Sequence, residues 1–250
     1  MRYSVCLDTL YPGVSVTEAL TRLRNNGFSH YECWGWWDRD TDEMLAAQQA
    51  TGVTPVGMCT REFTLNDPAK RIDYVAALRE TAEVCRKLGC PNIITQVGGD
   101  RQGVPYAEQL QSIVDGFIAC IPVLEEYGLT LLFEPLNLTN HPGYFLVHAE
   151  EAFFIAEAVN DPHVKVLYDI YHQQMTGDFR MEDVAGSIGL IGHFHVAGAP
   201  GRNEPLACGM GYPHIMAAVR AAGYEGTVGL EYMPLDDADD GLRKWLEACG

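Results

Sequence analysis

The sequence predicts an α/β protein of 250 residues that folds as one closed (β/α)8 barrel. Apolar, strand-like runs alternate with segments of helical periodicity along the whole chain, and there are eight of each. Glycines follow the helical segments, where a left-handed C-cap is expected. The length also agrees with one barrel of this architecture, which typically takes about 250 residues.

The strand-like runs are short, apolar and bounded by turn residues. In chain order they span residues 2–7, 29–33, 53–58, 92–97, 129–134, 164–169, 190–196 and 227–231. The helical segments place apolar residues three and four positions apart. They span residues 16–26, 41–51, 68–88, 106–127, 148–160, 181–188, 213–222 and 237–248. Because strands and helices alternate throughout, we expect a parallel sheet.

Glycine and proline mark the ends of these elements. The glycines expected to end helices are Gly27, Gly52, Gly89, Gly128 and Gly223. Asp67-Pro68 predicts a helix start and Asp161-Pro162 a turn. A doubly wound open sheet is the alternative, but residues 8–13, after the first strand, contain one glycine and lack its phosphate-binding fingerprint. No linker or low-complexity tract interrupts the chain, so we expect a single TIM-barrel domain over residues 1–250.

Composition excludes several function classes. The chain has 17 basic and 34 acidic residues, and its net charge of -17 at pH 7 repels nucleic acids and anionic membranes. No segment approaches the roughly 20 apolar residues of a membrane span, and residues 1–8 lack a signal peptide. Eight cysteines without a CxxC pair indicate reduced thiols and a cytoplasmic protein. For Cys6, Cys33 and Cys59 we favour core packing over a soft metal site.

Four consecutive strands end on a side chain that can bind a metal: Glu134, Asp169, His195 and Glu231. Neighbouring parallel strands lie about 4.8 Å apart and share one carboxyl rim, so these groups can meet. Three carboxylates and one imidazole suit Mg²⁺ or Mn²⁺, with Co, Ni or Zn also open. Isolated strand-end residues are the alternative, but crowded acids repel one another unless a cation or proton neutralises them.

A divalent metal flanked by Glu134 and Glu231 indicates a definite kind of reaction. The cation would polarise a carbonyl and stabilise an enediolate, while one carboxylate removes a carbon-bound proton and the other delivers one. Such a site interconverts a hydroxy-ketone with its aldehyde or its epimer. It needs no organic cofactor.

Several segments around these residues resemble hydroxypyruvate isomerase and, more broadly, the xylose-isomerase-like sugar isomerases and ketose 3-epimerases. The segments are Phe133-Glu-Pro-Leu-Asn137, His141-Pro-Gly-Tyr-Phe-Leu146, Tyr168-Asp-Ile-Tyr-His-Gln173, Gly192-His-Phe-His-Val-Ala197, Pro200-Gly-Arg-Asn-Glu-Pro205 and Gly229-Leu-Glu-Tyr-Met-Pro234. The resemblance is dense over residues 128–234. It implies that the four strand-end residues bind the metal and that the two glutamates exchange protons with substrate carbons.

The resemblance also implies that His172 and Arg202 contact the substrate, a small sugar or hydroxy-keto acid, and that the protein forms a homodimer or tetramer. For Arg202 a salt bridge to Glu204 is the alternative. The chain departs from hydroxypyruvate isomerases at two places. Hydroxypyruvate isomerases usually carry glutamine where this chain has His195. Histidine at this position is typical of the sugar epimerases. The segment 206–212 also lacks the usual acidic residue of hydroxypyruvate isomerases.

Two further groups are candidate substrate contacts. Trp36, with Trp34 and Trp37, follows the second strand and could stack on the substrate in a lid, although core packing or an oligomer contact explains it equally well. Gln96 ends the fourth strand and could reach the substrate or cap a loop. We expect His193 to be a buried barrel residue rather than a ligand.

We therefore hypothesise a divalent-metal-dependent isomerase acting on a small hydroxy-ketone or 2-oxo acid, with hydroxypyruvate as the first substrate to test. A ketose 3-epimerase of the tagatose or psicose type is the close alternative. A nuclease of the endonuclease IV type would need a histidine-rich three-metal site and a basic groove, and the net charge argues against it. A non-catalytic barrel is disfavoured by the complete set of four candidate ligands.

Overall fold

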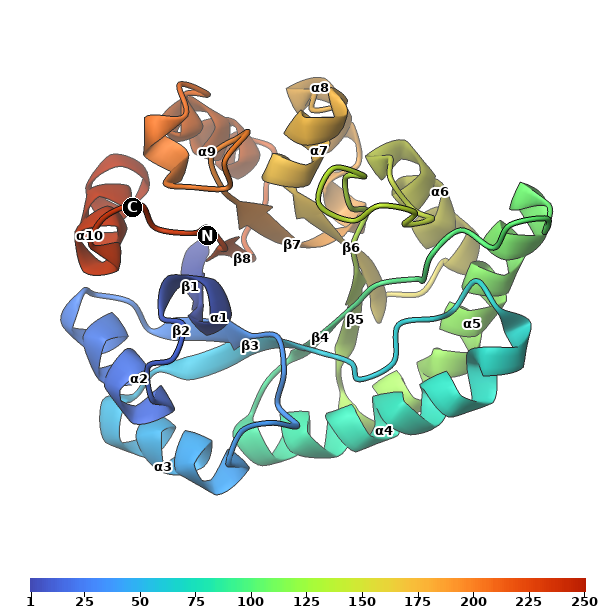
Figure 1. Cartoon of the computed structure of the whole chain (residues 1–250), viewed down its shortest axis with the longest axis horizontal. Helices are drawn as coiled ribbons and strands as arrows, with labels where there is room; N and C mark the ends of the chain where they lie inside the picture. Colours follow the sequence, from blue (N-terminus) through green and yellow to red (C-terminus); the bar gives the residue numbers. More distant parts are fainter.

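The computed structural model describes all 250 residues. Eight parallel strands close a barrel in the order β1 to β8, and the helices surround it (Figure 1). The strands are β1 (Arg2–Cys6), β2 (His30–Cys33), β3 (Thr54–Cys59), β4 (Asn92–Thr95), β5 (Thr130–Phe133), β6 (Val164–Asp169), β7 (Ile191–Val196) and β8 (Thr227–Leu230). The predicted (β/α)8 barrel is confirmed, and the strand ends differ from the prediction by two residues at most.

The main helices lie where periodicity predicted them. They are α2 (Val16–Asn25), α3 (Thr41–Thr51), α4 (Arg71–Leu88), α5 (Tyr106–Tyr127), α6 (Ala149–Val159), α8 (Met181–Gly186), α9 (Tyr212–Ala221) and α10 (Ala238–Cys249). Two short helices, α1 (Leu7–Leu10) and α7 (Ile170–Thr176), and three 3-10 turns, Pro68–Lys70, Ile188–Leu190 and Pro205–Ala207, were not predicted separately. Such short elements contain too few turns to give a periodic signal.

The predicted end signals are present. All five glycines expected after helices have positive φ, and Gly52, Gly89 and Gly128 form left-handed caps of α3, α4 and α5. Asp67 caps the turn at Pro68, because its side chain accepts a hydrogen bond from the Ala69 amide. These local rules therefore explain where the helices of the outer layer stop and turn back toward the barrel.

Strand register sets the height of the side chains inside the barrel. Asp169 on β6 pairs with His195 on β7, and His195 pairs with Gly229 on β8. The small inner core beneath them consists of Cys59, Ile94, Leu132 and Leu167, whereas the larger core lies between strands and helices. The carboxyl ends of β6, β7 and β8 thus reach the same level above a packed floor.

Helix α5 corrects one expectation. It is 22 residues long and apolar enough in composition to cross a membrane, although the sequence pattern predicted no such segment. Half of its apolar window is buried inside the protein, and the helix packs against α4 and α6. The apolar face of α5 is therefore part of the core of the barrel.

Candidate active site

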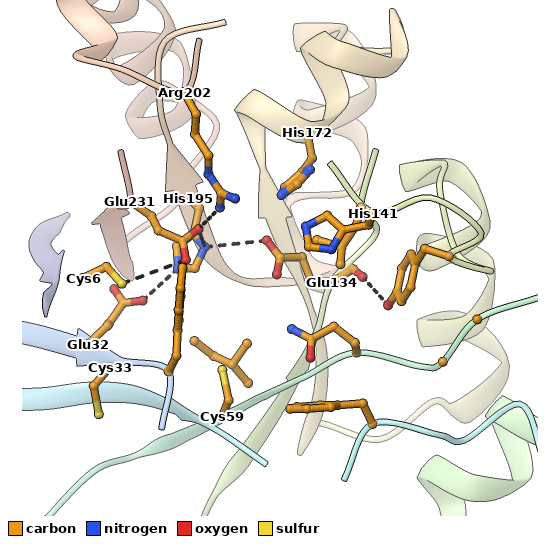
Figure 2. A pocket seen from close by; sticks show the side chains of 18 of the residues that line it. Cys6, Glu32, Cys33, Cys59, Glu134, His141, His172, His195, Arg202 and Glu231 are labelled. Carbon is orange, nitrogen blue, oxygen red and sulfur yellow. Dashed lines mark hydrogen bonds and ion pairs between the residues drawn. The ribbon is translucent and has the colours of Figure 1, made fainter. Parts of the chain in front are cut away.

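A cavity of about 430 Å³ lies at the carboxyl ends of the strands. Its wall includes Glu134, His195 and Glu231, and Asp169 lies beneath its surface, fully buried. Figure 2 shows Arg202 and His172 on one side of the cavity and Cys33 and Cys59 on the opposite side. This is the end of the barrel where enzymes of this architecture bind their substrates.

The structure brings the four predicted ligands together. One potential ligand atom from each of Glu134, Asp169, His195 and Glu231 lies within 4.8 Å of the others, and all four residues are buried. His195 Nδ1 is 3.2 Å from Glu231 Oε2 and 3.6 Å from Glu134 Oε1. Ligand positions at the ends of four successive strands therefore converge, as strand geometry predicted.

Backbone contacts hold two of these residues in place. Asp169 ends β6 and caps α7, where its Oδ1 accepts a hydrogen bond of 2.8 Å from the Tyr171 amide. Its Oδ2 is left facing the other ligands. The Glu231 amide donates to the carbonyl of Val196, so the ladder between β7 and β8 continues to the ligand itself. Each carboxylate is therefore aimed by the strand that carries it.

The donor set fits a divalent cation. Glu134 Oε1, Asp169 Oδ2 and His195 Nδ1 are buried and have no hydrogen-bond partner in the protein. Buried polar atoms without partners are rare in folded proteins and each calls for an explanation. Two oxygens and one nitrogen around a common point, with a third carboxylate beside them, are suitable ligands for Mg²⁺, Mn²⁺ or Zn²⁺.

Crowding of the ligands shows in their pKa values. Burial, and then the negative charge of Glu134, raise the pKa of Asp169 to about 7. Burial opposes protonation of His195, but the charges of Glu231 and Glu32 raise its pKa well above the usual value. The Glu231 carboxyl is also desolvated, but Arg202 and His195 hold its pKa well below its usual range. The cluster thus requires positive charge within it.

Glu32, on β2, is a site residue that the sequence pattern did not indicate. Its carboxylate accepts hydrogen bonds from His193 Nε2 at 3.0 Å, from His195 Nε2 at 2.7 Å, and from the Ser4 hydroxyl. Although burial acts in the opposite direction, the positive charges of His193 and His195 hold the pKa of Glu32 well below its usual range. His193 is buried and bonded only to Glu32, which agrees with the predicted barrel histidine.

Arg202 reaches into the site from the loop after β7. Its guanidinium donates a hydrogen bond to Glu231 Oε2, lies 3.9 Å from Asp169 Oδ2, and packs over the Tyr171 ring. The alternative salt bridge to Glu204 does not form. Arg202 Nε is buried without a partner, so part of the guanidinium fork remains free for a ligand.

His172 lies on α7 and faces the cavity. Its Nδ1 accepts hydrogen bonds from the backbone and side-chain nitrogens of Asn137, at 3.1 and 2.6 Å. Nε2 therefore carries the proton of the neutral ring. It has no hydrogen-bond partner, and the carboxylate oxygen that faces it, Asp169 Oδ2, is 3.5 Å away. Burial, and then the positive charge of Arg202, lower the pKa of His172 well below its usual value. His172 thus presents a neutral N–H donor to the cavity.

The tryptophan prediction is wrong for Trp36. Its indole N–H donates to Thr81 on α4, 3.2 Å away, and the residue does not line the cavity. The flanking Trp34 and Trp37 do line it, and the Trp34 indole N–H donates to Glu231 Oε1 at 2.6 Å. Gln96 also lines the cavity, and its contact with a substrate stays a prediction.

Other cavity residues were present in the sequence motifs but not singled out. His141 lines the cavity with its ring centroid 5.5 Å from that of His172. Tyr144 donates to the Glu134 carbonyl and accepts from the Val97 amide, which ties the ends of β4 and β5 together. Their only sequence signal was the segment 141–146 after the fifth strand. Cys6, Cys33 and Cys59 line the opposite wall as free thiols.

Comparison with known proteins identifies the family of this barrel. The family model described as "Xylose isomerase-like TIM barrel" matches residues 20–249, which is most of the chain. The chain belongs to this family. It is 30% identical to a human protein named "Putative hydroxypyruvate isomerase", over 99% of this chain and 95% of that protein. It is 26% identical to the "2-oxo-tetronate isomerase" of Cupriavidus necator, over 98% and 97% of the two chains.

A solved member of the same fold is also similar along the full length. The crystal structure of a protein named "AP endonuclease, family 2" from Brucella melitensis superposes with a TM-score of 0.92 at 25% sequence identity, covering 98% of both chains. The resemblance expected from residues 128–234 thus extends across the whole xylose isomerase-like barrel.

Proposed function

We propose that this xylose isomerase-like protein is a divalent-metal-dependent isomerase of a small hydroxy-ketone or 2-oxo acid. Relatives named hydroxypyruvate isomerase and 2-oxo-tetronate isomerase, similar over nearly the full length, support an isomerase. The observation that carries the proposal is the pair of buried glutamates, Glu134 and Glu231, which face one set of partnerless ligand atoms.

Glu134, Asp169, His195 and Glu231 would hold the metal ion. When bound, a divalent cation supplies Lewis-acid polarisation of the substrate carbonyl and stabilises enediolate charge. The carboxylates of Glu134 and Glu231 would transfer the protons to and from the substrate carbons. On hydroxypyruvate, one glutamate takes a proton from C3, and the other, protonated beforehand from solvent, delivers a proton to C2; exchange with solvent then restores both carboxyl groups. The hydroxyl proton passes from the C3 oxygen to the C2 oxygen, so the carbonyl moves from C2 to C3 and tartronate semialdehyde results.

Two side chains support a substrate with a carboxylate or several hydroxyls. Arg202 offers a partly unpaired guanidinium fork, and His172 offers a neutral Nε2–H without a hydrogen-bond partner. A planar guanidinium suits the two oxygens of a carboxylate. We assign substrate binding to these two residues, and an accessory contact to Gln96, which lines the same cavity.

Proton NMR in heavy water with added Mn²⁺ tests this function. Wild-type protein should convert hydroxypyruvate to the aldehyde and incorporate deuterium at carbon. Glu134→Gln and Glu231→Gln should each lower kcat by about 10²- to 10⁴-fold, the typical contribution of a positioned acid or base. Glu225→Gln, at an exposed position before β8, is the matched control and should retain activity. Normal turnover by both site variants overturns the proposal.

A ketose 3-epimerase is the second candidate, because His195 occupies the position where the sequence resemblance places histidine in sugar epimerases. Epimerisation of tagatose or psicose exchanges the proton at C3 and leaves the ketone in place. The same NMR experiment with these ketoses distinguishes the two activities.

The remaining assignments are a small-molecule substrate, a cytoplasmic location and a homodimer or tetramer. Light scattering of the purified protein tests the last of these. DNA-repair chemistry, which the name of the Brucella protein suggests, is disfavoured by the net charge of -17. Measurable binding to an abasic duplex at moderate salt would restore it.

A further inference from the structure

We propose that Glu32 is a positioning residue that holds His195 with Nδ1 facing the other three ligands. The inference rests on the metal site of the proposed function but not on which substrate is used. Glu32 comes from β2, which β3 and β4 separate from the ligand-bearing β5 and β6 in the barrel order. Figure 2 shows it beside His195, with Glu134 on the other side of the ring. It is separated from His195 by 163 residues along the chain.

Each oxygen of the Glu32 carboxylate accepts a hydrogen bond from a different histidine ring. His195 Nε2 donates to Oε2 at 2.7 Å, and His193 Nε2 donates to Oε1 at 3.0 Å. The Ser4 hydroxyl on β1 also donates to Oε1. All four residues are buried. Glu32 is thereby fixed from both β1 and β7, and it can in turn fix His195.

An ionised carboxylate only accepts hydrogen bonds, so the Nε2 atom of His195 must carry a proton. The other nitrogen, Nδ1, is then the atom available to a cation, and it is the one that faces Glu134 and Glu231. Carboxylate partners of this kind fix the tautomer and ring orientation of metal-binding histidines. The structure contains that arrangement, with the His195 ring between Glu32 and the ligand set.

Packing against β8 restricts the ring further. A Cβ added at Gly229 would lie 2.5 Å from Glu32 Oε1 and 2.7 Å from His195 Cδ2. Gly229 is the residue opposite His195 in the strand register. A side chain at position 229 would therefore displace the Glu32–His195 contact, and the chain has glycine there. Because the ring is enclosed, its orientation depends on Glu32 and not on solvent.

A purely structural role is the competing explanation, because a buried Glu–His cluster also fills the barrel interior. Such a cluster is weak evidence for stability, since desolvation offsets much of its attraction. The two roles differ in what they predict for metal affinity. A structural role predicts loss of folding stability alone, whereas a positioning role predicts weaker metal binding by the folded protein.

The test is a titration of metal-free, full-length protein with Mn²⁺. Electron paramagnetic resonance measures the free Mn²⁺ at each step and so gives the Kd. Glu32→Gln should bind Mn²⁺ about 10- to 100-fold more weakly than wild type, the usual effect of losing such a partner. Thr95→Val is the matched control, since Thr95 is equally buried and hydrogen-bonded to Tyr74 but does not line the cavity. Thr95→Val should keep the wild-type affinity for Mn²⁺ even if its melting temperature is lower.

A second measurement needs no variant and covers the case that Glu32→Gln fails to fold. In Zn²⁺-loaded wild-type protein, nitrogen-15 NMR of the imidazoles should show His195 protonated at Nε2 and metal-bound at Nδ1. The reverse assignment overturns the inference, as does equal Mn²⁺ affinity of Glu32→Gln and wild type. Wild-type protein that binds Mn²⁺ but converts no ketose or keto acid overturns the proposed function alone. Wild-type protein that binds neither metal overturns both.

Discussion

Replacing Asp169 with asparagine should stabilise the metal-free protein and remove its stabilisation by metal. Asp169 is fully buried, and its pKa is raised to about 7 by burial and by the charge of Glu134. Asparagine keeps the oxygen that accepts from the Tyr171 amide. It also replaces the partnerless Oδ2 with an N–H donor, within 4.8 Å of a ligand atom of Glu134.

The size of the effect follows from the pKa of Asp169. Because its folded value lies above the unfolded value of 3.8, the ionised form destabilises the folded protein. This penalty is absent below pH 3.8, grows as the pH rises, and is complete above about pH 7, where it amounts to about 4 kcal/mol. Burying the amide costs about 1–3 kcal/mol of that gain. We therefore expect metal-free Asp169→Asn to be about 1–3 kcal/mol more stable than wild type at pH 8.

Thermal unfolding in EDTA and in excess Mn²⁺ measures both effects. Each kcal/mol corresponds to about 2–4 °C in a protein of this size, so the EDTA melting temperature should rise by several degrees at pH 8. At pH 5 the penalty is only about 1.6 kcal/mol, which the cost of burying the amide offsets, so the melting temperature should change little. Mn²⁺ at about 100 times its Kd should add about 2.7 kcal/mol to wild type and little to the variant. Asp236→Asn, at an exposed carboxylate, should change neither value. A variant that melts below wild type in EDTA at pH 8, or that gains as much stability from Mn²⁺ as wild type does, refutes the reasoning.

Two other predictions concern activity and packing. Trp34→Phe removes the indole N–H that contacts Glu231 at 2.6 Å but keeps a ring at this half-exposed position, so kcat/KM should fall by about 10-fold or more without loss of fold. Steady-state kinetics measure this, and an unchanged kcat/KM contradicts it. Gly192→Ala places a Cβ 2.5 Å from Leu132 Cδ2 and 2.8 Å from Lys165 Cβ, and should cost about 1–3 kcal/mol in urea unfolding. Gly186→Ala, where a Cβ meets nothing within 4 Å, should cost much less.

The fold and the convergence of the four candidate ligands were predictable because both depend on local pattern. Each strand is an apolar run, and each ligand is the residue at or next to the end of its run, so the parallel barrel aligns them without further information. Glu32 was not predictable in this way. It lies within β2, and its partners His193 and His195 are more than 160 residues away.

The loops were the least predictable part of the site. Trp34, Trp36 and Trp37 follow β2 without a repeating period, so the sequence does not indicate which ring faces inward. The structure turns Trp36 toward Thr81 and leaves the other two at the cavity. The sequence pattern did not predict helix α7 either, because the start of this helix depends on a side-chain cap by Asp169. The same hydrogen bond, from the Tyr171 amide to Asp169, also orients the Asp169 carboxylate.

The two glutamates differ in how firmly they are held. Glu231 accepts hydrogen bonds from Trp34 at one oxygen and from Arg202 at the other. The Glu134 carboxylate accepts none, and its closest charged neighbour, His195 Nδ1, is 3.6 Å from Oε1. Only the Glu134 backbone is anchored, through Tyr144 at its carbonyl and Thr95 at its amide. Glu134 can therefore move its carboxylate toward a substrate carbon without breaking a hydrogen bond.

This asymmetry predicts different consequences for the two glutamine variants. Glu134→Gln should lower kcat while leaving the melting temperature of the metal-free protein near that of wild type. Glu231→Gln should lower kcat and also destabilise the protein, because an amide cannot satisfy Arg202 and Trp34 as a carboxylate does and Arg202 is left with an unpaired charge. Melting curves beside single-turnover rates separate the two effects. Equal destabilisation by both variants would show that the hydrogen bonds to Glu231 do not restrain it, and the assignment of Glu134 as the mobile proton carrier would then fail.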